Sequence, residues 1–246
     1  RYGQDLGAGT PQDLYLGKCS LIMTELDLKE LGVRGVNSTL HGLADGANDQ
    51  DWLITHPMGQ HAIACGLDAP IEVTIDGHVG FYCGGMNQQA GITIQGHAGV
   101  GVAENMMSGH VRVTGSASDS AGATAHGGLL VIEGDASSRC GISMKGVDIV
   151  VGGSVGPMSG FMAQSGHLVV CGDASHALGD SIYEAILFVR GKVGDLGADC
   201  IEKQMRPEHL LKLAELLAAA GMAGEPADFR RYGSARELYH FDIDNA

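Results

Sequence analysis

The sequence predicts a right-handed parallel β-helix, an all-β fold in which a short coil of chain stacks repeatedly on itself. Three observations predict this fold. They are evenly spaced glycines, columns of apolar residues in register with those glycines, and small residues at fixed places in each repeat. The glycines follow one another every 19 residues, at Gly77, Gly96, Gly115, Gly134, Gly153, Gly172 and Gly191. A constant period of about 20 residues is typical of one structural unit stacked many times.

Each repeat should contain one short buried strand just before its glycine. The first apolar column contains Val73, Ile92, Val111, Leu130, Ile149, Leu168 and Leu187. The second contains Ile75, Ile94, Val113, Ile132, Val151, Val170 and Val189. The columns are two positions apart, so both side chains point to one side of an extended strand. Most of these residues are β-branched, which favours a strand.

Small residues at other fixed positions predict tight corners between the sides of each coil. Two residues after each glycine come Val79, Ala98, Ala117, Ala136, Val155, Ala174 and Val193, and the next residue is always Gly or Ser. Four positions further stand Gly84, Ala103, Gly122, Gly141, Gly160, Gly179 and Ala198. We expect about seven coils with about three short sides each. Leucine-rich, hexapeptide and calcium-binding nonapeptide repeats need patterns that this sequence lacks.

The position between the two core columns should face outward, and its character changes along the chain. It reads Thr74, Thr93, Arg112, Val131, Val150, Val169 and Phe188. A continuous apolar strip is rarely left in water. We therefore predict that the last four of these side chains are covered, either by a helix at residues 207–220 or by a partner subunit.

Three regions are expected: an N-terminal arm and cap at residues 1–52, the β-helix at 53–205, and a C-terminal helix and interface tail at 206–246. Residues 1–26 read as irregular. Residues 26–43 predict one or two short helices broken at glycines, with Leu28, Leu31, Val36 and Leu40 near one face. Residues 52–64 predict an imperfect first coil. A cap of this kind stops end-to-end association of a solenoid.

The C-terminal region predicts a helix from Pro207 to Ala220 that Gly221 ends. Its apolar face should contain Leu210, Leu211, Leu213, Ala214 and Leu217. The following tail, residues 228–246, is rich in Arg and aromatic residues, as interface segments are. The tail either contacts a partner or folds back on its own chain.

Composition and charge narrow the functional classes. The chain has 29 acidic and 15 basic residues and a formal net charge of −14, which disfavours nucleic acid and anionic membranes as partners. There is neither an apolar run long enough to cross a membrane nor a recognisable signal peptide. The six cysteines, Cys19, Cys65, Cys83, Cys140, Cys171 and Cys200, lack metal-site spacing. We expect them to be reduced in a cytoplasmic protein.

No catalytic, cofactor-binding or metal-binding residue is predicted on this chain. The glycines from Gly80 to Gly85 form a corner of the repeat, not a phosphate loop. His78 and His97 begin a column of polar residues that we interpret as a solvated ladder and not as a metal site. Asp76 and Glu133 lie three coils apart, too far for paired carboxylate chemistry.

The glycine rhythm is similar to that of a known domain. The segments Gly153-Ser-Val-Gly156-Pro-Met-Ser-Gly160 and Gly191-Lys-Val-Gly194 resemble the GXGXG domain, over about residues 26–205. That domain forms the C-terminal β-helix of the glutamate synthase large subunit and also occurs as a free-standing subunit. The segment at 36–43 and the tail at 229–239 (Phe-Arg-Arg-Tyr-Gly-Ser-Ala-Arg-Glu-Leu-Tyr) resemble the free-standing subunit of N-methylglutamate synthase, a methylamine–glutamate N-methyltransferase.

The resemblance implies a non-catalytic structural subunit in a hetero-oligomer. It implies an amidotransferase-like partner and a synthase-like partner carrying FMN and iron–sulfur clusters, with this chain bracing the two. The complex would make N-methylglutamate from glutamate and methylamine. The alternatives are the equivalent subunit of an ordinary glutamate synthase, a chain like the GXGXG-type subunit of formylmethanofuran dehydrogenase, and a stand-alone β-helix with a structural or carbohydrate-active role.

Overall fold

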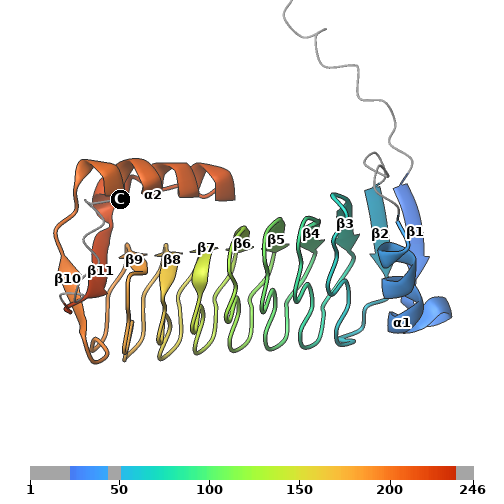
Figure 1. Ribbon diagram of the computed structural model, residues 1–246, viewed down its shortest axis with the longest axis horizontal. Coiled ribbons are helices and arrows are strands. Elements are labelled where there is room, and N and C mark those ends of the chain that lie inside the picture. Colours follow the sequence, from blue (N-terminus) through green and yellow to red (C-terminus); the bar gives the residue numbers. More distant parts are fainter. Residues whose placement is uncertain (1–22, 44–50, 237–246) are drawn as a thin grey trace, which may run out of the picture.

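The chain folds into a long parallel β-helix that carries a helix at each end (Figure 1). The computed structural model describes residues 23–43 and 51–236. One sheet of eleven strands runs along the molecule in the order β1-β2-β3-β4-β5-β6-β7-β8-β9-β11-β10. Its strands are β1 (Met23–Asp27), β2 (Asp51–Thr55), β3 (Glu72–Ile75), β4 (Gly91–Ile94), β5 (His110–Val113), β6 (Leu129–Ile132), β7 (Lys145–Val151), β8 (Ser165–Val170), β9 (Ile186–Val189), β10 (Cys200–Lys203) and β11 (Arg230–Ser234).

The stacking follows the period of the sequence. Val73 pairs with Ile92, Ile92 with Val111, and the same 19-residue step continues to Leu187 in β9. Both predicted core columns lie inside the column of coils, and no side chain in them is more than 1% exposed. The interior is therefore filled by close-packed aliphatic side chains, and the predicted parallel β-helix is confirmed.

Two further features confirm the expected shape of each coil. A second line of parallel pairing joins the column that runs from Val79 and Ala98 to Val193. The predicted corners lie where the backbone enters the left-handed region, for example at Gly84 (φ 65°), Ala103 (φ 55°) and Gly160 (φ 70°). Larger residues such as Arg139 also adopt this conformation, so the small residues at these corners are explained by the packed interior, where an added Cβ at Gly160 would lie 3.2 Å from Leu187 Cδ2.

The N-terminal end contains more regular structure than the sequence suggested. Residues 1–26 were expected to be irregular, but β1 pairs in parallel with β2 and extends the sheet by one strand. Helix α1 (Leu28–His41) follows β1 at once, and Asp27 caps it by accepting the backbone N–H of Lys29 at 2.8 Å. Its backbone leaves the helical region at Gly32, one of the two predicted breaks. Leu31 is exposed, contrary to expectation, whereas Leu28, Val36 and Leu40 are buried.

The C-terminal end reverses strand direction. After β10 come α2 (Pro207–Ala220), a short 3-10 helix η1 (Pro226–Asp228) and β11. Strand β11 inserts between β9 and β10 and pairs antiparallel with both. The described part of the tail therefore folds on its own chain. The remaining residues of the expected tail, 237–246, lie outside the described residues.

Candidate interaction face

The outer face of the sheet is the most distinctive surface of the molecule, and we call its covered part the capped face. The capped face consists of Val131, Val150, Val169 and Phe188, one from each of β6 to β9. At most 3% of each side chain is exposed. Figure 1 shows α2 running along the sheet above these strands. The prediction that the apolar strip is covered is confirmed, and the cover is the chain's own C-terminal helix.

Helix α2 begins and ends where the sequence predicted, but it presents a different face. Pro207 occupies its first turn, and Gly221 ends it in the left-handed conformation (φ 67°). The buried side chains are those of Leu213, Leu216, Leu217 and Ala220, and Phe229 completes the contact. Leu211 is 68% exposed, so its expected place on the apolar face is wrong. Ala214 is exposed as well.

Polar contacts fix the position of α2 on the sheet. Asp148, in β7, accepts from His167 Nδ1 at 2.7 Å and from Lys212 Nζ at 3.0 Å. Burial raises the pKa of Asp148, but the hydrogen bonds from His167 and Lys212 outweigh burial and hold that pKa below its ordinary value. At the other end of the helix, Arg112 Nη2 donates to the Ala220 carbonyl at 2.7 Å. A cation is favourable there because the last carbonyls of a helix are otherwise unpaired.

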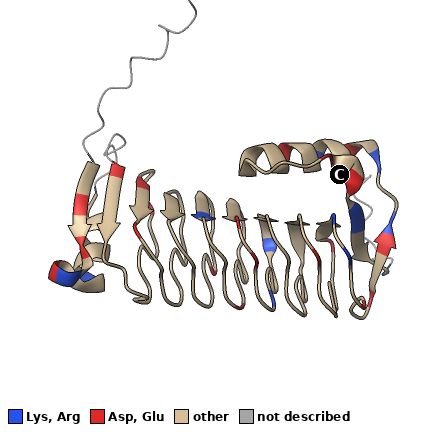
Figure 2. Cartoon of the chain, turned by 180° about the vertical axis from the view of Figure 1, so that it is seen from behind, with Lys and Arg blue, Asp and Glu red and all other residues tan. Residues whose placement is uncertain are grey.

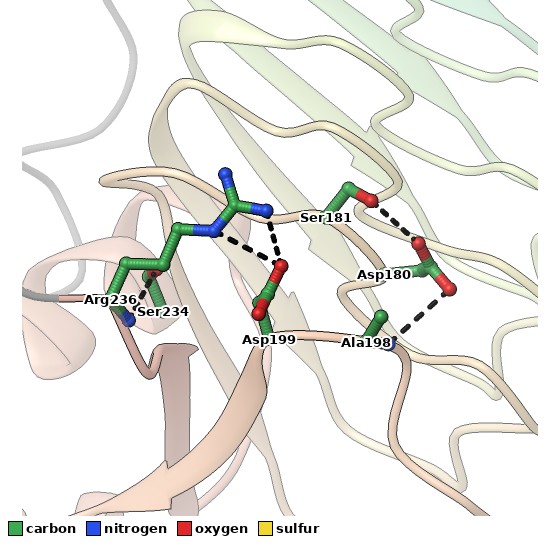
Figure 3. A network of polar contacts seen from close by, with 6 residues as sticks. All are labelled: Asp180, Ser181, Ala198, Asp199, Ser234 and Arg236. Carbon is green, nitrogen blue, oxygen red and sulfur yellow. Dashed lines mark hydrogen bonds and ion pairs between the residues drawn. The ribbon is translucent and has the colours of Figure 1, made fainter.

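A second network attaches the end of the described chain to the last coil (Figure 3). Arg236 donates from Nε to Asp199 at 3.0 Å and also from Nη2 to the same oxygen. The backbone N–H of Ala235 donates to the Asp199 carbonyl at 2.7 Å. Beside it, Asp180 accepts from the Ser181 hydroxyl at 2.8 Å and from the Ala198 N–H at 3.3 Å. These contacts hold β11 and the adjoining turn against the final coils.

The polar column that begins with His78 is a continuous hydrogen-bond ladder. In each coil the side chain accepts the backbone N–H of the equivalent residue in the next coil. The His97 N–H donates to His78 Nδ1 at 2.9 Å, and the Ser116 N–H donates to His97 Nδ1 at 2.8 Å. The same contact continues through Asp135, Ser154 and Asp173 to Lys192. The structural task of this ladder is to satisfy backbone donors at one corner.

The chemically reactive side chains are spread over different coils. Within residues 23–43 and 51–236, no group of three or more His, Cys, Asp and Glu residues is placed to hold a metal ion. Cys83 and Cys140 are buried, and burial raises the pKa of the Cys140 thiol to about 12. Cys65 is partly buried, and burial raises its thiol pKa to about 11. Such thiols are poor nucleophiles near neutral pH.

Comparison with known proteins places the chain in a family. No family model matches the sequence. It is 60% identical over 225 residues to Protein GlxC of Rhizobium meliloti (strain 1021), an alignment that covers 91% of this chain and 99% of that protein. The chain belongs to the GlxC family. In this GlxC-family chain, no described helix is both long and apolar enough to cross a membrane.

Charge is distributed unevenly along this GlxC-family chain. Although the net charge is −14, eight of the 15 Lys and Arg residues lie between positions 190 and 236. They are Arg190, Lys192, Lys203, Arg206, Lys212, Arg230, Arg231 and Arg236. The same segment contains seven Asp and Glu residues, so it has one more basic than acidic residue (8 − 7). Figure 2 shows basic residues on β11 and on the segment between β10 and α2.

Proposed function

We propose that this chain is a non-catalytic structural subunit of a glutamate-synthase-like complex that makes N-methylglutamate from glutamate and methylamine. The observation that carries the proposal is the glycine rhythm of the coils, which resembles the GXGXG domain. Membership of the GlxC family supports the proposal, because 99% of that relative lies within the alignment and the relative therefore has no large additional domain.

The packed interior supports a bracing role. Both core columns are filled with aliphatic side chains that are at most 1% exposed, so a substrate has no room inside the column. The described cysteines come from different coils and most are buried. We therefore assign FMN and iron–sulfur clusters to a synthase-like partner, and glutamine-type amide chemistry to an amidotransferase-like partner. A path for ammonia or methylamine would run along the outer surface of the column, against a partner.

An exposed aromatic cluster in the first coils supports binding of a partner. Phe81 is 50% exposed and Val100, beside it in the next coil, is 45% exposed. The Phe81 ring lies 5.4 Å from the ring of His61 and 5.8 Å from that of Tyr82. Aromatic residues are few in this chain, at 5% of its composition. Exposed aromatic side chains are enriched in protein interfaces, and we propose that this cluster contacts a partner subunit.

Purification from the native host with an affinity tag tests the proposal. We expect the chain to come with a yellow-brown partner that shows flavin and iron–sulfur absorption and with an amidotransferase-like chain. The assembly should consume methylamine and glutamate. Consumption of glutamine-derived ammonia with 2-oxoglutarate instead would indicate an ordinary glutamate synthase. A molybdenum or tungsten pterin partner, or an isolated monomer with its own hydrolase or lyase activity, would overturn the proposal.

Two matched variants locate the partner contact. Phe81→Ser should lower the yield of co-purified partner by about tenfold or more, because buried aromatic residues often dominate an interface. Met162→Ser removes an exposed apolar side chain from a later coil and should leave the yield unchanged. Equal recovery with both variants would place the partner elsewhere on the column.

A further inference from the structure

The C-terminal end of the β-helix contains a small hollow lined mainly by basic and hydroxyl side chains. Its volume is about 250 Å³, and it lies where the turn before β9 meets β10 and β11. The side chains that matter for its chemistry are those of Tyr183, Glu184, Lys203, Arg231, Ser234 and Arg236. Neither the core of the β-helix nor the capped face accounts for this collection of cations.

Two of the cations face one another across neighbouring strands. Lys203 of β10 is the register partner of Arg231 of β11, so their side chains lie on the same face of the sheet. Among the described residues, no carboxylate lies within 4.0 Å of the charged atoms of either side chain. Arg231 Nε donates to the Gln204 carbonyl at 3.0 Å. The other guanidinium donors of Arg231 make no hydrogen bond within the described chain.

Burial and neighbouring positive charges lower the pKa values of two basic side chains in this region. Burial lowers the pKa of Arg231, and the neighbouring Arg206 lowers it further, although Glu208 opposes them. Burial and then Arg231 likewise lower the pKa of His209. Arg231 therefore has positively charged neighbours at the start of α2, outside the hollow itself.

The third cation is held in place by the network of Figure 3. Asp199 fixes Arg236 through Nε and Nη2, so the remaining Nη1 is available to another acceptor. The Arg236 guanidinium lies 6.0 Å from the centre of the Tyr183 ring. Ser234 is 7% exposed, and its hydroxyl oxygen accepts the backbone N–H of Arg236 at 3.2 Å. The hydroxyl proton of Ser234 makes no hydrogen bond among the described residues.

The acidic residues nearby are mostly committed to other partners. Glu202 lies 3.8 Å from Arg230, and Glu208 lies 3.7 Å from Arg206. Glu184 is the one carboxylate that lines the hollow. Asp199 pairs with Arg236, so the two cations without a carboxylate partner are Lys203 and Arg231. This local excess of positive charge occurs in a chain whose net charge is −14. An oxyanion is the kind of group that such an arrangement stabilises, since Arg and Lys bind phosphate and carboxylate oxygens through charge-assisted hydrogen bonds.

We propose that this hollow is a binding site for an oxyanion, a phosphate or carboxylate group, held by Lys203, Arg231 and Arg236 with the Ser234 hydroxyl as a further donor. The site is independent of the proposed function, because it depends only on residues of this chain. It lies far along the column from the exposed aromatic cluster around Phe81, which is in the first coils (Figure 1).

Isothermal titration of the full chain with inorganic phosphate, in chloride buffer at constant ionic strength, tests the proposal. A parallel titration with glutarate distinguishes phosphate from carboxylate recognition. We expect saturable binding of at least one of the two at one site per chain. Lys203→Met should weaken it by about tenfold, as loss of one charge-assisted contact does. The control Lys192→Met removes an exposed lysine from the last coil and should leave binding unchanged.

The chain's own acidic residues need a separate variant. Residues 237–246 follow Arg236 directly and include Glu237, Asp242 and Asp244. Replacing these three with Gln or Asn keeps the chain length and removes their charge. If the unaltered chain binds the added anion and Lys203→Met weakens that binding, the result supports the proposed oxyanion site. Binding that appears only in the neutralised variant would mean that the chain supplies its own anion and would overturn the proposal. Absence of binding in both, or equal loss with Lys192→Met, would also overturn it.

Discussion

The outer face of the sheet has the same backbone register along its length, yet its two halves differ. In β3 to β5 the outward residue is Thr74, Thr93 or Arg112, and each is partly exposed. In β6 to β9 the equivalent residues form the capped face and lie under α2. The 19-residue step is identical in both halves, so the backbone does not decide which half binds a helix. The difference teaches that one side-chain column specifies where the cap docks.

A charged residue placed in the capped face should lower the stability of the protein more than the other changes considered below. Val150 is fully buried beneath α2, and Val150→Asp places a carboxylate there without a cationic partner. We expect a loss of about 4 kcal/mol in the free energy of unfolding, because an uncompensated buried charge is strongly destabilising. Urea unfolding followed by circular dichroism measures it. Thr93→Asp, at the same position in the open half, should change stability by less than about 1 kcal/mol. Similar losses in both variants would contradict the comparison.

A bulky residue at a corner should be nearly as damaging to stability, and it tests the packing of the coils beneath the capped half. Gly160 has φ 70°, and an added Cβ would lie 3.2 Å from Leu187 Cδ2. We expect Gly160→Val to cost about 3 kcal/mol through backbone strain and overpacking. It should also weaken assembly with partners before it affects any chemistry that they perform.

The matched variant is Gly160→Ala, because Ala103 occupies the equivalent corner of an earlier coil in the left-handed region, with φ 55°. It should be milder than Gly160→Val by at least about 1 kcal/mol. Thermal unfolding of both variants measures the difference. Equal destabilisation would show that side-chain size at this corner is unimportant.

Exchanging Val and Thr between the two halves should change the free energy of unfolding less, and it sharpens the comparison. Val150→Thr keeps the shape of the side chain but buries a hydroxyl under α2, which should cost about 1–2 kcal/mol. Thr93→Val in the open half should change the free energy of unfolding by less than about 0.5 kcal/mol. Chemical unfolding of the two variants under identical conditions gives both values. A larger cost for Thr93→Val would mean that the open half also depends on its outward residues.

The polar anchor of the cap should contribute least and should depend on pH. Asp148→Asn should cost about 1 kcal/mol at pH 7, since the Lys212 contact is partly exposed. The folded-state pKa of Asp148 lies below its ordinary value of 3.8, so its contribution is present above that pH and is lost as the pH falls through the lower folded value. The stability difference between the unaltered chain and the variant should therefore shrink below about pH 4. A difference that grows on acidification would contradict this assignment.

The sequence predicted the structure well where coils repeat and where particular residues mark the ends of a helix. The period located the parallel strands, the core columns and the corners, and Pro207 and Gly221 marked the ends of α2. The sequence was less informative about which side of α2 faces the sheet. Leucines surround α2 on several sides, and only the shape of the sheet beneath it selects Leu213, Leu216 and Leu217 over Leu211. Local apolar patterning cannot make that choice.

Strand pairings and side-chain contacts that lie outside the 19-residue repeat could not be predicted from the sequence either. Strand β1 joins β2 across helix α1, outside the 19-residue step, so no column marks it. Strand β11 pairs antiparallel with strands far away in the chain. The Asp148, His167 and Lys212 contacts unite two coils with α2, and no spacing rule connects them. The hollow around Lys203 and Arg231 likewise exists only because β11 inserts beside β10. The concentration of Lys and Arg after position 189 was its one visible signal.

The insertion of β11 between β9 and β10 has a consequence for biosynthesis. Earlier coils can stack as soon as they leave the ribosome, because each contacts only its neighbour. Strand β9 must wait for residues 230–234, which are made on the order of seconds later. During that interval a nascent chain carries an open sheet edge, the feature that most readily recruits other chains into aggregates. We therefore expect efficient production of the protein to depend on protection of this edge by a chaperone or on rapid completion of translation.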